Sequence, residues 1–226
     1  FGLLGVMVLA SGYSLLVSYI GLEILSLSLY AMVAFDRDSA RSAEAAMKYF
    51  VLGAIASGTL LYGMSLIYGI TGTLQIGELQ TAIAAKSDVV GLWVGLGFMV
   101  VGVAFKFGAV PFHMWVPDVY DGAATPVTLY IGTAPKLGAL ALAVRLLVEG
   151  AEGLVSFWEP MLAALAVLSL VLGNVAAIAQ TSIRRMLAYS TISHVGFILL
   201  GLVAGSPAGV QAALFYTIVY VIMAAG

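Results

Sequence analysis

Long apolar runs are the feature of this sequence that most limits its fold. The segment from Met161 to Ala179 contains no charged residue, and several other runs are as long or longer. A helix rises about 1.5 Å per residue, so about 20 apolar residues cross a ~30 Å hydrocarbon core. Membrane β-strands would instead alternate apolar and polar residues over ~10 positions. The sequence therefore predicts an all-α bundle of membrane-spanning helices.

The composition agrees with this interpretation. Hydrophobic residues make up 62% of the 226 residues and charged residues 9%, whereas a soluble domain has roughly 45–50% and about 25%. Such a chain lacks the polar side chains that a water-exposed surface needs. At most roughly nine or ten short-looped crossings fit into this length. We expect a single transmembrane domain over residues 1–226, without a separate soluble domain.

Cysteine is absent, and the formal net charge is −2. The first fact excludes disulfides, thiolate-held iron–sulfur clusters and zinc ribbons, and the second leaves no basic surface for nucleic acid. We therefore expect no cofactor on this chain and any redox centre on a partner. No basic segment precedes the apolar run at Phe1, and Gly226 lies in an apolar segment, so we also expect a piece of a longer polytopic protein.

The predicted helices follow from the apolar runs and the turn signals between them. They cover approximately residues 1–11, 13–34, 44–69, 89–122, 127–148, 157–179, 186–203 and 208–225. A charged loop follows the second, and a polar loop from Ile70 to Asp88 follows the third.

Basic residues concentrate in alternate loops. One side has Arg37, Arg41, Arg184 and Arg185, and the other has Lys86, with Arg145 near a helix end and the acidic Glu149, Glu152 and Glu159. The positive-inside rule places the arginine-rich side in the cytoplasm.

Several ionisable residues fall inside the predicted spans, where a charge costs on the order of 3 kcal/mol. They are Glu23, Lys48, Lys106, Lys136 and His194. Such groups usually face a bundle interior or a hydrated cavity and take part in function. Simpler interpretations stay open: a lysine that reaches the interface for Lys48, static salt bridges for Glu23, Lys106 and Lys136, and a hydrogen-bonded packing residue for His194.

These residue types suit proton movement. Burial lowers the pKa of a lysine and a nearby carboxylate raises it, so a Glu–Lys pair that opens and closes can release or capture a proton. We predict such a switch between Glu23 and Lys48. The further candidates are Lys106 and Lys136 as successive acceptors, and His113 and His194 as groups that titrate at about neutral pH.

Prolines interrupt two of the predicted spans. Pro111 and Pro117 lack the amide hydrogen that a helix interior needs, so the segment from Lys106 to Asp118 is predicted to be a broken helix that lines a hydrated cavity. Pro135 frees the carbonyl of Ile131 and gives Lys136 similar polar surroundings. The alternative is that these prolines produce ordinary kinks without a function.

A short internal similarity is also present. Ala45-Ala46-Met47-Lys48-Tyr49 recurs as Ala212-Ala213-Leu214-Phe215-Tyr216, and the two predicted helices start from opposite sides of the membrane. This is typical of an inverted repeat, although a chance similarity of two apolar segments is the competing explanation.

Four segments resemble a known family. They are GLEILSLSLYAMVAF (21–35), EAAMKYFVLGAIASG (44–58), FKFGAVPFHMWVPDVYDGAATPV (105–127) and RRMLAYSTISHVGF (184–197). They closely resemble the subunit N family of bacterial NADH:quinone oxidoreductase, respiratory complex I, whose members are antiporter-like, proton-translocating membrane subunits. The similarity covers essentially the whole chain.

The resemblance implies a fold of two inverted five-helix repeats, the first over roughly 1–150 and the start of the second over roughly 157–226. It also implies a role for each candidate residue. Glu23 and Lys48 would form a charge pair that responds to neighbouring subunits, Lys106 would be the central proton carrier, Lys136 would pass protons onward, and His113 and His194 would lie on a hydrated axis. A further lysine of the family would lie beyond Gly226.

The function implied by the resemblance is proton translocation coupled to quinone reduction. The chain would be a multi-pass subunit in the bacterial inner membrane, in contact with lipid and with other membrane and peripheral subunits of a respiratory complex. Flavin, iron–sulfur clusters and quinone would be on those partners. Three alternatives stay open: a subunit of a multisubunit cation/proton antiporter, a photosynthetic complex with similar subunits, and a structural membrane subunit with static salt bridges.

Overall fold

A computed structural model describes residues 1–86 and 89–225. Ser87 and Asp88, at the end of the predicted polar loop, and Gly226, the last residue of the predicted domain, lie outside the described residues. Throughout the described part the regular elements are helices, and seven helical segments are long and apolar enough to cross a membrane. The prediction of an all-α polytopic membrane protein is therefore confirmed.

The helices agree in position with most of the predicted spans, although several predicted spans are divided. They are α1 (Gly2–Ser11), α2 (Leu15–Val33), α3 (Ala40–Thr71), α4 (Ile76–Ala84), α5 (Val90–Phe107), α6 (Trp115–Gly122), α7 (Thr125–Gly132), α8 (Ala134–Ala143), α9 (Val155–Ile178), α10 (Ile183–Val203) and α11 (Pro207–Ala225). A π-helical turn, Val144–Glu149, continues α8, and a 3₁₀ turn, Glu152–Leu154, precedes α9.

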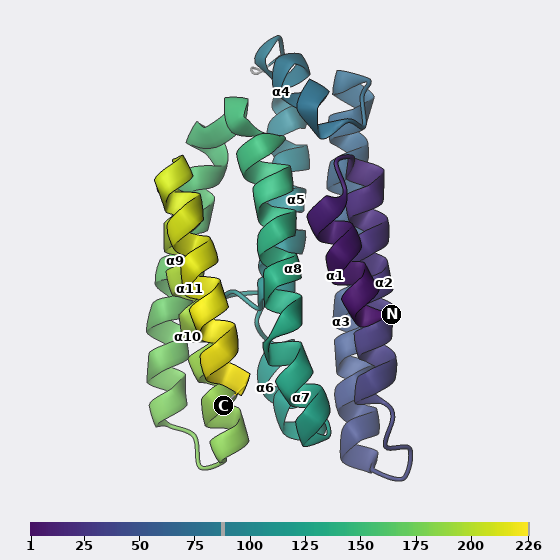
Figure 1. The fold of residues 1–226 in the computed structure, drawn as a ribbon, viewed down its shortest axis with the longest axis vertical. Helices are drawn as coiled ribbons and strands as arrows, with labels where there is room; N and C mark the ends of the chain where they lie inside the picture. The colour runs from purple at the N-terminus through teal and green to yellow at the C-terminus, as the bar shows by residue number, and fades with distance from the viewer. Residues whose placement is uncertain (87–88, 226) are drawn as a thin grey trace.

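The long helices run roughly along the long axis of the molecule, and α5 and α8 lie between two groups, α1 to α3 and α9 to α11 (Figure 1). The short helix α4 lies at one end. The α2–α3 and α9–α10 connections and the α6–α7 corner lie at the opposite end (Figure 1). The break between α5 and α6 therefore lies inside the bundle.

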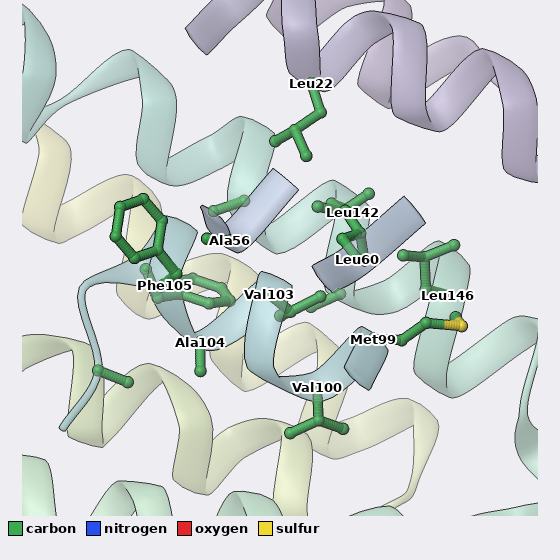
Figure 2. Close-up of a cluster of buried hydrophobic side chains, with 14 of the residues drawn as sticks. Leu22, Ala56, Leu60, Met99, Val100, Val103, Ala104, Phe105, Leu142 and Leu146 are labelled. Carbon is green, nitrogen blue, oxygen red and sulfur yellow. The ribbon is translucent and has the colours of Figure 1, made fainter. Parts of the chain in front are cut away.

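The core is centred on α5. Figure 2 shows Val100 and Val103 of α5 among Leu60 of α3 and Leu142 of α8, all of which are buried. Large apolar side chains also cover the outer faces, and Ile222 of α11 is 68% exposed. In water such an exposed apolar surface would be unfavourable, but in a bilayer it contacts lipid.

Helices α3 and α5 pack closely because two glycines face each other. A Cβ atom on Gly63 would lie 2.6 Å from the carbonyl oxygen of Gly95, and one on Gly95 would lie 3.1 Å from the carbonyl oxygen of Gly63. Small residues at a helix crossing are typical of membrane bundles, where close van der Waals packing holds helices together.

One predicted helix boundary and one predicted loop are wrong. Helix α3 begins at Ala40 instead of Glu44, because the Ser39 side chain caps it by accepting a hydrogen bond from the Ser42 amide at 3.2 Å. The predicted polar loop 70–88 contains the helix α4, which buries one apolar face composed of Ile76, Leu79 and Ile83. The 3–4 spacing of these residues was the signal for a helix.

The predicted helix 127–148 is in fact two helices. It breaks at Thr133, whose φ of −115° and ψ of −94° are not helical. Pro135 then lies in the first turn of α8, where its missing amide hydrogen removes no intrahelical bond. The Thr133 hydroxyl donates to the Leu129 carbonyl at 2.8 Å and satisfies part of the interrupted backbone.

Helices α3 and α11, which carry the two similar segments, run in opposite directions in Figure 1. This is the direction that an inverted repeat requires. The repeat itself, and the division into residues 1–150 and 157–226, remain predictions.

Candidate functional site

The first part of the site is the C-terminal end of α5, which local sequence determines. Gly108 ends the helix in the left-handed conformation, with φ of 77°, and its amide donates to the Phe105 carbonyl at 3.0 Å. Pro111 then prevents continuation. Lys106 lies in the last turn, where the partial negative charge of the helix end favours a cation.

Lys106 is 6% exposed, and its Nζ atom donates to the Ser26 hydroxyl of α2 at 2.8 Å. Among the described residues, no carboxylate lies within 4 Å of this ammonium. Glu23 is one helical turn from Ser26 along α2 and accepts a short hydrogen bond from the Ser57 hydroxyl of α3. The predicted buried position of Lys106 is confirmed, and its immediate partner is a neutral hydroxyl.

Lys136 is 1% exposed and lies in the first turn of α8. Its Nζ atom donates to the Phe107 carbonyl at 2.7 Å and lies 5.8 Å from the centroid of the Trp115 ring. The positive end of the α8 dipole disfavours a cation here, and the negative end of α5 offsets that effect. Lys136 thus has a polar partner, and that partner is a backbone carbonyl of another helix.

The two buried lysines thus share one helix end. Lys136 is bonded to the residue that directly follows Lys106 in the chain. Within the described part of the chain, each ammonium has one hydrogen-bond acceptor although it carries three donors.

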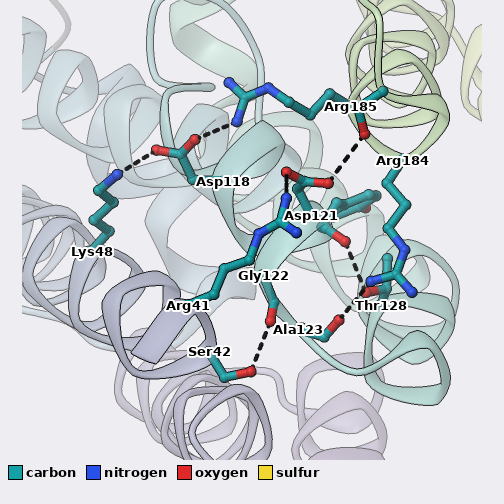
Figure 3. Close-up of polar contacts among 12 residues, drawn as sticks. Arg41, Ser42, Lys48, Asp118, Asp121, Gly122, Ala123, Thr128, Arg184 and Arg185 are labelled. Atoms are coloured by element: carbon teal, nitrogen blue, oxygen red, sulfur yellow. Dashed lines mark hydrogen bonds and ion pairs between the residues drawn. The ribbon is translucent and has the colours of Figure 1, made fainter. Parts of the chain in front are cut away.

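The third lysine, Lys48, does not lie beside Glu23. Its Nζ atom is 2.9 Å from Oδ2 of Asp118 (Figure 3). The same atom is 2.8 Å from Oε1 of Glu44, and the Lys48 side chain is 45% exposed. The α3 residue that contacts Glu23 is Ser57, nine residues after Lys48, which is about 13 Å along the helix. The predicted Glu23–Lys48 pair is therefore wrong for this structure.

Lys48 belongs to a group of charged side chains, which we call the face cluster. Its members are Arg41, Glu44 and Lys48 from α3, Asp118 and Asp121 from α6, and Arg185 from α10, and together they line a cavity of about 190 Å³. Asp118 also accepts a hydrogen bond from Arg185 at 2.8 Å, and Asp121 forms an ion pair with Arg41 (Figure 3). Each of these two carboxylates therefore binds at least one cation.

The short helix α6 is not among the seven candidate spans, so Asp118 lies outside them. Burial raises the pKa of this carboxyl, but hydrogen bonds and charges from Lys48 and Arg185 outweigh that effect and hold it below its usual range. Asp118 is therefore a stable anion that ties α3 and α10 to α6.

The two carboxylates of the face cluster were not predicted as functional residues. Asp118 was predicted only as the end of the broken segment, and Asp121 was not predicted. Their spacing of three residues directly after Pro117 was an available signal, since it puts two acids on one face of a short helix.

The broken helix between Lys106 and Asp118 is confirmed, with one correction. Pro117 is not part of the break, because it lies in the first turn of α6 where no intrahelical bond is lost. The Ser169 hydroxyl of α9 accepts a hydrogen bond from the Val110 amide at 2.9 Å and stabilises the non-helical backbone. Each end of the broken segment lines a cavity. Asp118 lines the cavity of the face cluster, and Lys106 lines a smaller cavity of about 10 Å³.

The two histidines occupy separate positions. His113 is half-buried in the α5–α6 break, and among the described residues no hydrogen bond joins its ring to Lys106 or Lys136. His194 of α10 has its Nδ1 atom 2.8 Å from the Tyr216 hydroxyl and lines a cavity of about 410 Å³. The structure therefore brings Lys106 and Lys136 together with Glu23 nearby, and leaves Lys48, His113 and His194 apart.

Metal binding has no support in the described part of the chain, which contains no group of three or more His, Cys, Asp or Glu side chains suited to a metal ion.

Comparison with known families identifies strong similarity. The profile of the family described as "NADH:quinone oxidoreductase/Mrp antiporter, TM" matches residues 12–226. The chain is 65% identical to NADH-quinone oxidoreductase subunit N of Thioalkalivibrio sulfidiphilus, over all of this chain and 48% of the relative. It is 61% identical to the subunit of the same name from Alkalilimnicola ehrlichii, over all of this chain and 46% of that protein. The chain thus spans about half the length of the curated relatives it matches.

Solved structures show the same fold. A chain of respiratory complex I from Thermus thermophilus, with bound aureothin, has a TM-score of 0.82 and 41% identity, over 98% of this chain and 47% of that chain. A chain of an archaeal membrane-bound sulfane sulfur reductase gives 0.84 and 33%, over 97% and 46%. A chain of the Mrp complex from a Dietzia species gives 0.88 and 26%, over 98% and 41%. The fold is antiporter-like.

Proposed function

The chain belongs to the family of NADH:quinone oxidoreductase and Mrp antiporter membrane subunits, and on that premise we propose that it is the central part of a subunit N that translocates protons in a bacterial NADH:quinone oxidoreductase. It would be a multi-pass protein of the inner membrane. Translocation would be coupled to quinone reduction that takes place on partner subunits, with flavin and iron–sulfur clusters there and no redox centre on this chain.

The observation that carries the proposal is the pair of buried lysines at the end of α5. Burying a charge without a paired opposite charge is costly, whereas burying a neutral amine costs much less. The protonation of Lys106 and Lys136 is therefore sensitive to any charge that moves near them. A pump needs such sites, because proton affinity must change during the cycle.

The other candidate residues have supporting roles in this proposal. Glu23 acts on Lys106 and not on Lys48, because Ser26 joins its helix directly to Lys106. Lys48 acts with the face cluster, whose cavity supplies a polar opening at the end of the bundle. His113 in the break and His194 in its own cavity are further proton-binding groups on the polar axis.

The test is Lys106→Ala in the full-length subunit within its complex. Proton pumping in inverted membrane vesicles should fall to background, since the carrier is removed, and it is measured together with quinone reduction by NADH. Lys86→Ala is the control, because Lys86 is an exposed loop lysine whose ammonium donates to the Ile70 carbonyl. Unchanged proton pumping per electron in Lys106→Ala would contradict the proposal.

A second candidate function is cation/proton antiport without redox input. The fold similarity to the Mrp complex and the family description favour it as the alternative. It predicts sodium-dependent pH changes in vesicles that contain the full-length protein but no NADH-oxidising subunits. The 65% identity to a named subunit N, against 26% to the Mrp chain, favours the first function.

A further inference from the structure

A small cavity between α2, α3 and α5 is the basis of a further inference. Its volume is about 10 Å³, which is close to the least that holds one water molecule. The polar residues that line it are Ser26 and Tyr30 from α2, Ser57 from α3 and Lys106 from α5. A single water needs two to four polar partners, so this lining is sufficient.

The hydrogen bonds already present leave room for such a water. Ser26 donates its hydroxyl proton to the Leu22 carbonyl at 2.6 Å and accepts from Lys106 at 2.8 Å, which leaves it one free lone pair. Ser57 donates its proton to Glu23 and keeps its lone pairs. Lys106 has further N–H donors. One water can therefore donate to both serines and accept from Lys106.

Tyr30 is held in position by its neighbours. Its ring packs edge-on against Tyr49 and Phe50, with centroids 4.7 Å and 5.7 Å away. Its hydroxyl lies against Gly53 of α3, where any Cβ atom would overlap it. The glycine thus lets the Tyr30 hydroxyl approach α3 at the level of the cavity, where it can donate a hydrogen bond to a water.

We propose that this cavity is a site for one water molecule, which links Ser57 and hence Glu23 to Lys106. The role of the link depends on the proposed function, in which Lys106 carries protons. A proton passes from Lys106 to the water, a water proton passes to Ser57, and the Ser57 hydroxyl proton passes to Glu23. The result is a neutral amine and a neutral carboxylic acid, while the water and the serine regain their original composition.

The test uses the complete complex with variants in the full-length subunit. Ser57→Ala removes the hydroxyl that reaches Glu23, and Ala56→Val fills the cavity while it keeps every hydroxyl. Both should slow proton pumping about tenfold, which corresponds to the loss of about one hydrogen bond in the transfer step. Ser57→Thr, which retains a hydroxyl, should pump nearly normally. Ser28→Ala is the matched control, because the Ser28 hydroxyl donates to the Ile24 carbonyl on the same helix and does not line the cavity.

A high-resolution electron cryomicroscopy map supplies an independent measurement. It should show one ordered water within hydrogen-bond distance of Ser26, Ser57 and Lys106, and no such water in Ala56→Val. A native map without the water would overturn the inference, and so would Ser57→Ala and Ala56→Val complexes that pump like Ser28→Ala. If Lys106→Ala abolishes pumping in the same preparations, only the water link is wrong; if Lys106→Ala pumps normally, the proposed function is wrong.

Discussion

The buried lysines and the face cluster differ in the groups that accept hydrogen bonds from their cations. In the middle of the bundle, Lys106 and Lys136 have a hydroxyl and a carbonyl as their acceptors. At the end of the bundle, Lys48 contacts two carboxylates, and Asp118 in turn contacts two cations. Both groups adjoin the same broken helix, one at each end.

The difference indicates a division of roles along that helix. Charges that are matched by neighbours hold elements together and keep their protonation constant. Charges that are matched only by neutral dipoles cost free energy when buried, so they respond to changes around them. We therefore expect substitutions in the middle to change transport and substitutions in the face cluster to change local stability.

The largest effect on this comparison should come from Lys136→Met, which keeps the apolar length of the side chain and removes the amine. Proton pumping should fall at least tenfold, because an acceptor between the two helix breaks is lost. Thermal stability of the complex should stay the same or increase, since replacing a buried charge by an apolar group is often stabilising. Pumping and thermal unfolding are measured in parallel, with Lys86→Met as the control. A destabilised complex with normal pumping would reverse the assignment.

Asp118→Asn should produce the opposite result. Lys48 and Arg185 would lose a common anion, at a cost of about 1–2 kcal/mol in local stability. Hydrogen–deuterium exchange in the intact complex should become roughly 5–30-fold faster in α6, in proportion to that free energy. Asp38→Asn, in the exposed α2–α3 loop, is the control. No change in the exchange of α6 would show that the face cluster does not hold this helix.

The membrane spans could be predicted well from the sequence because each depends on a local feature, an apolar run bounded by turn residues. The sequence also predicted the α5–α6 break, since Pro111 lacks the amide hydrogen that a helix interior needs. Helix α4 was missed because it is too short to cross a membrane and polar residues separate its buried apolar ones. The buried positions of Lys106 and Lys136 were predictable for the same local reason.

The partners of these residues were not predictable in the same way. Whether Glu23 meets Lys48 or Ser57 depends on how far α2 is shifted along α3, and no local pattern specifies that shift. Lys136 bonds to Phe107, a residue 29 positions away whose carbonyl becomes available only because α5 ends there. Sequence reasoning therefore identified the charged groups but not the contacts that distinguish the two regions.

A smaller effect is expected from the pH dependence of the stability that Asp118 gives to α6. Because the folded pKa of Asp118 lies below its usual value, the unfolded state binds the proton more readily, so stability from this carboxylate is complete above about pH 4. It is lost as pH falls through the lower folded value. At each pH, the ratio of the α6 exchange rates of Asp118→Asn and the native protein measures this stability. The ratio should thus be constant from about pH 8 to 5 and decrease only below about pH 4. A ratio that decreases at about neutral pH would contradict the ion pairing.

The smallest effect should come from Tyr216→Phe, which removes the hydroxyl beside His194. One partly buried hydrogen bond is worth about 0.5–1.5 kcal/mol, so exchange in α10 and α11 should accelerate modestly. Proton pumping should change less than about twofold, the equivalent of ~0.4 kcal/mol, because His194 lies in a cavity apart from the two lysines. Tyr62→Phe, on the exposed face of α3, is the control. A loss of pumping as large as that of Lys136→Met would instead give His194 a role as central as that of the two lysines, and neutral hydrogen-bond partners would then mark the principal transport groups throughout the molecule.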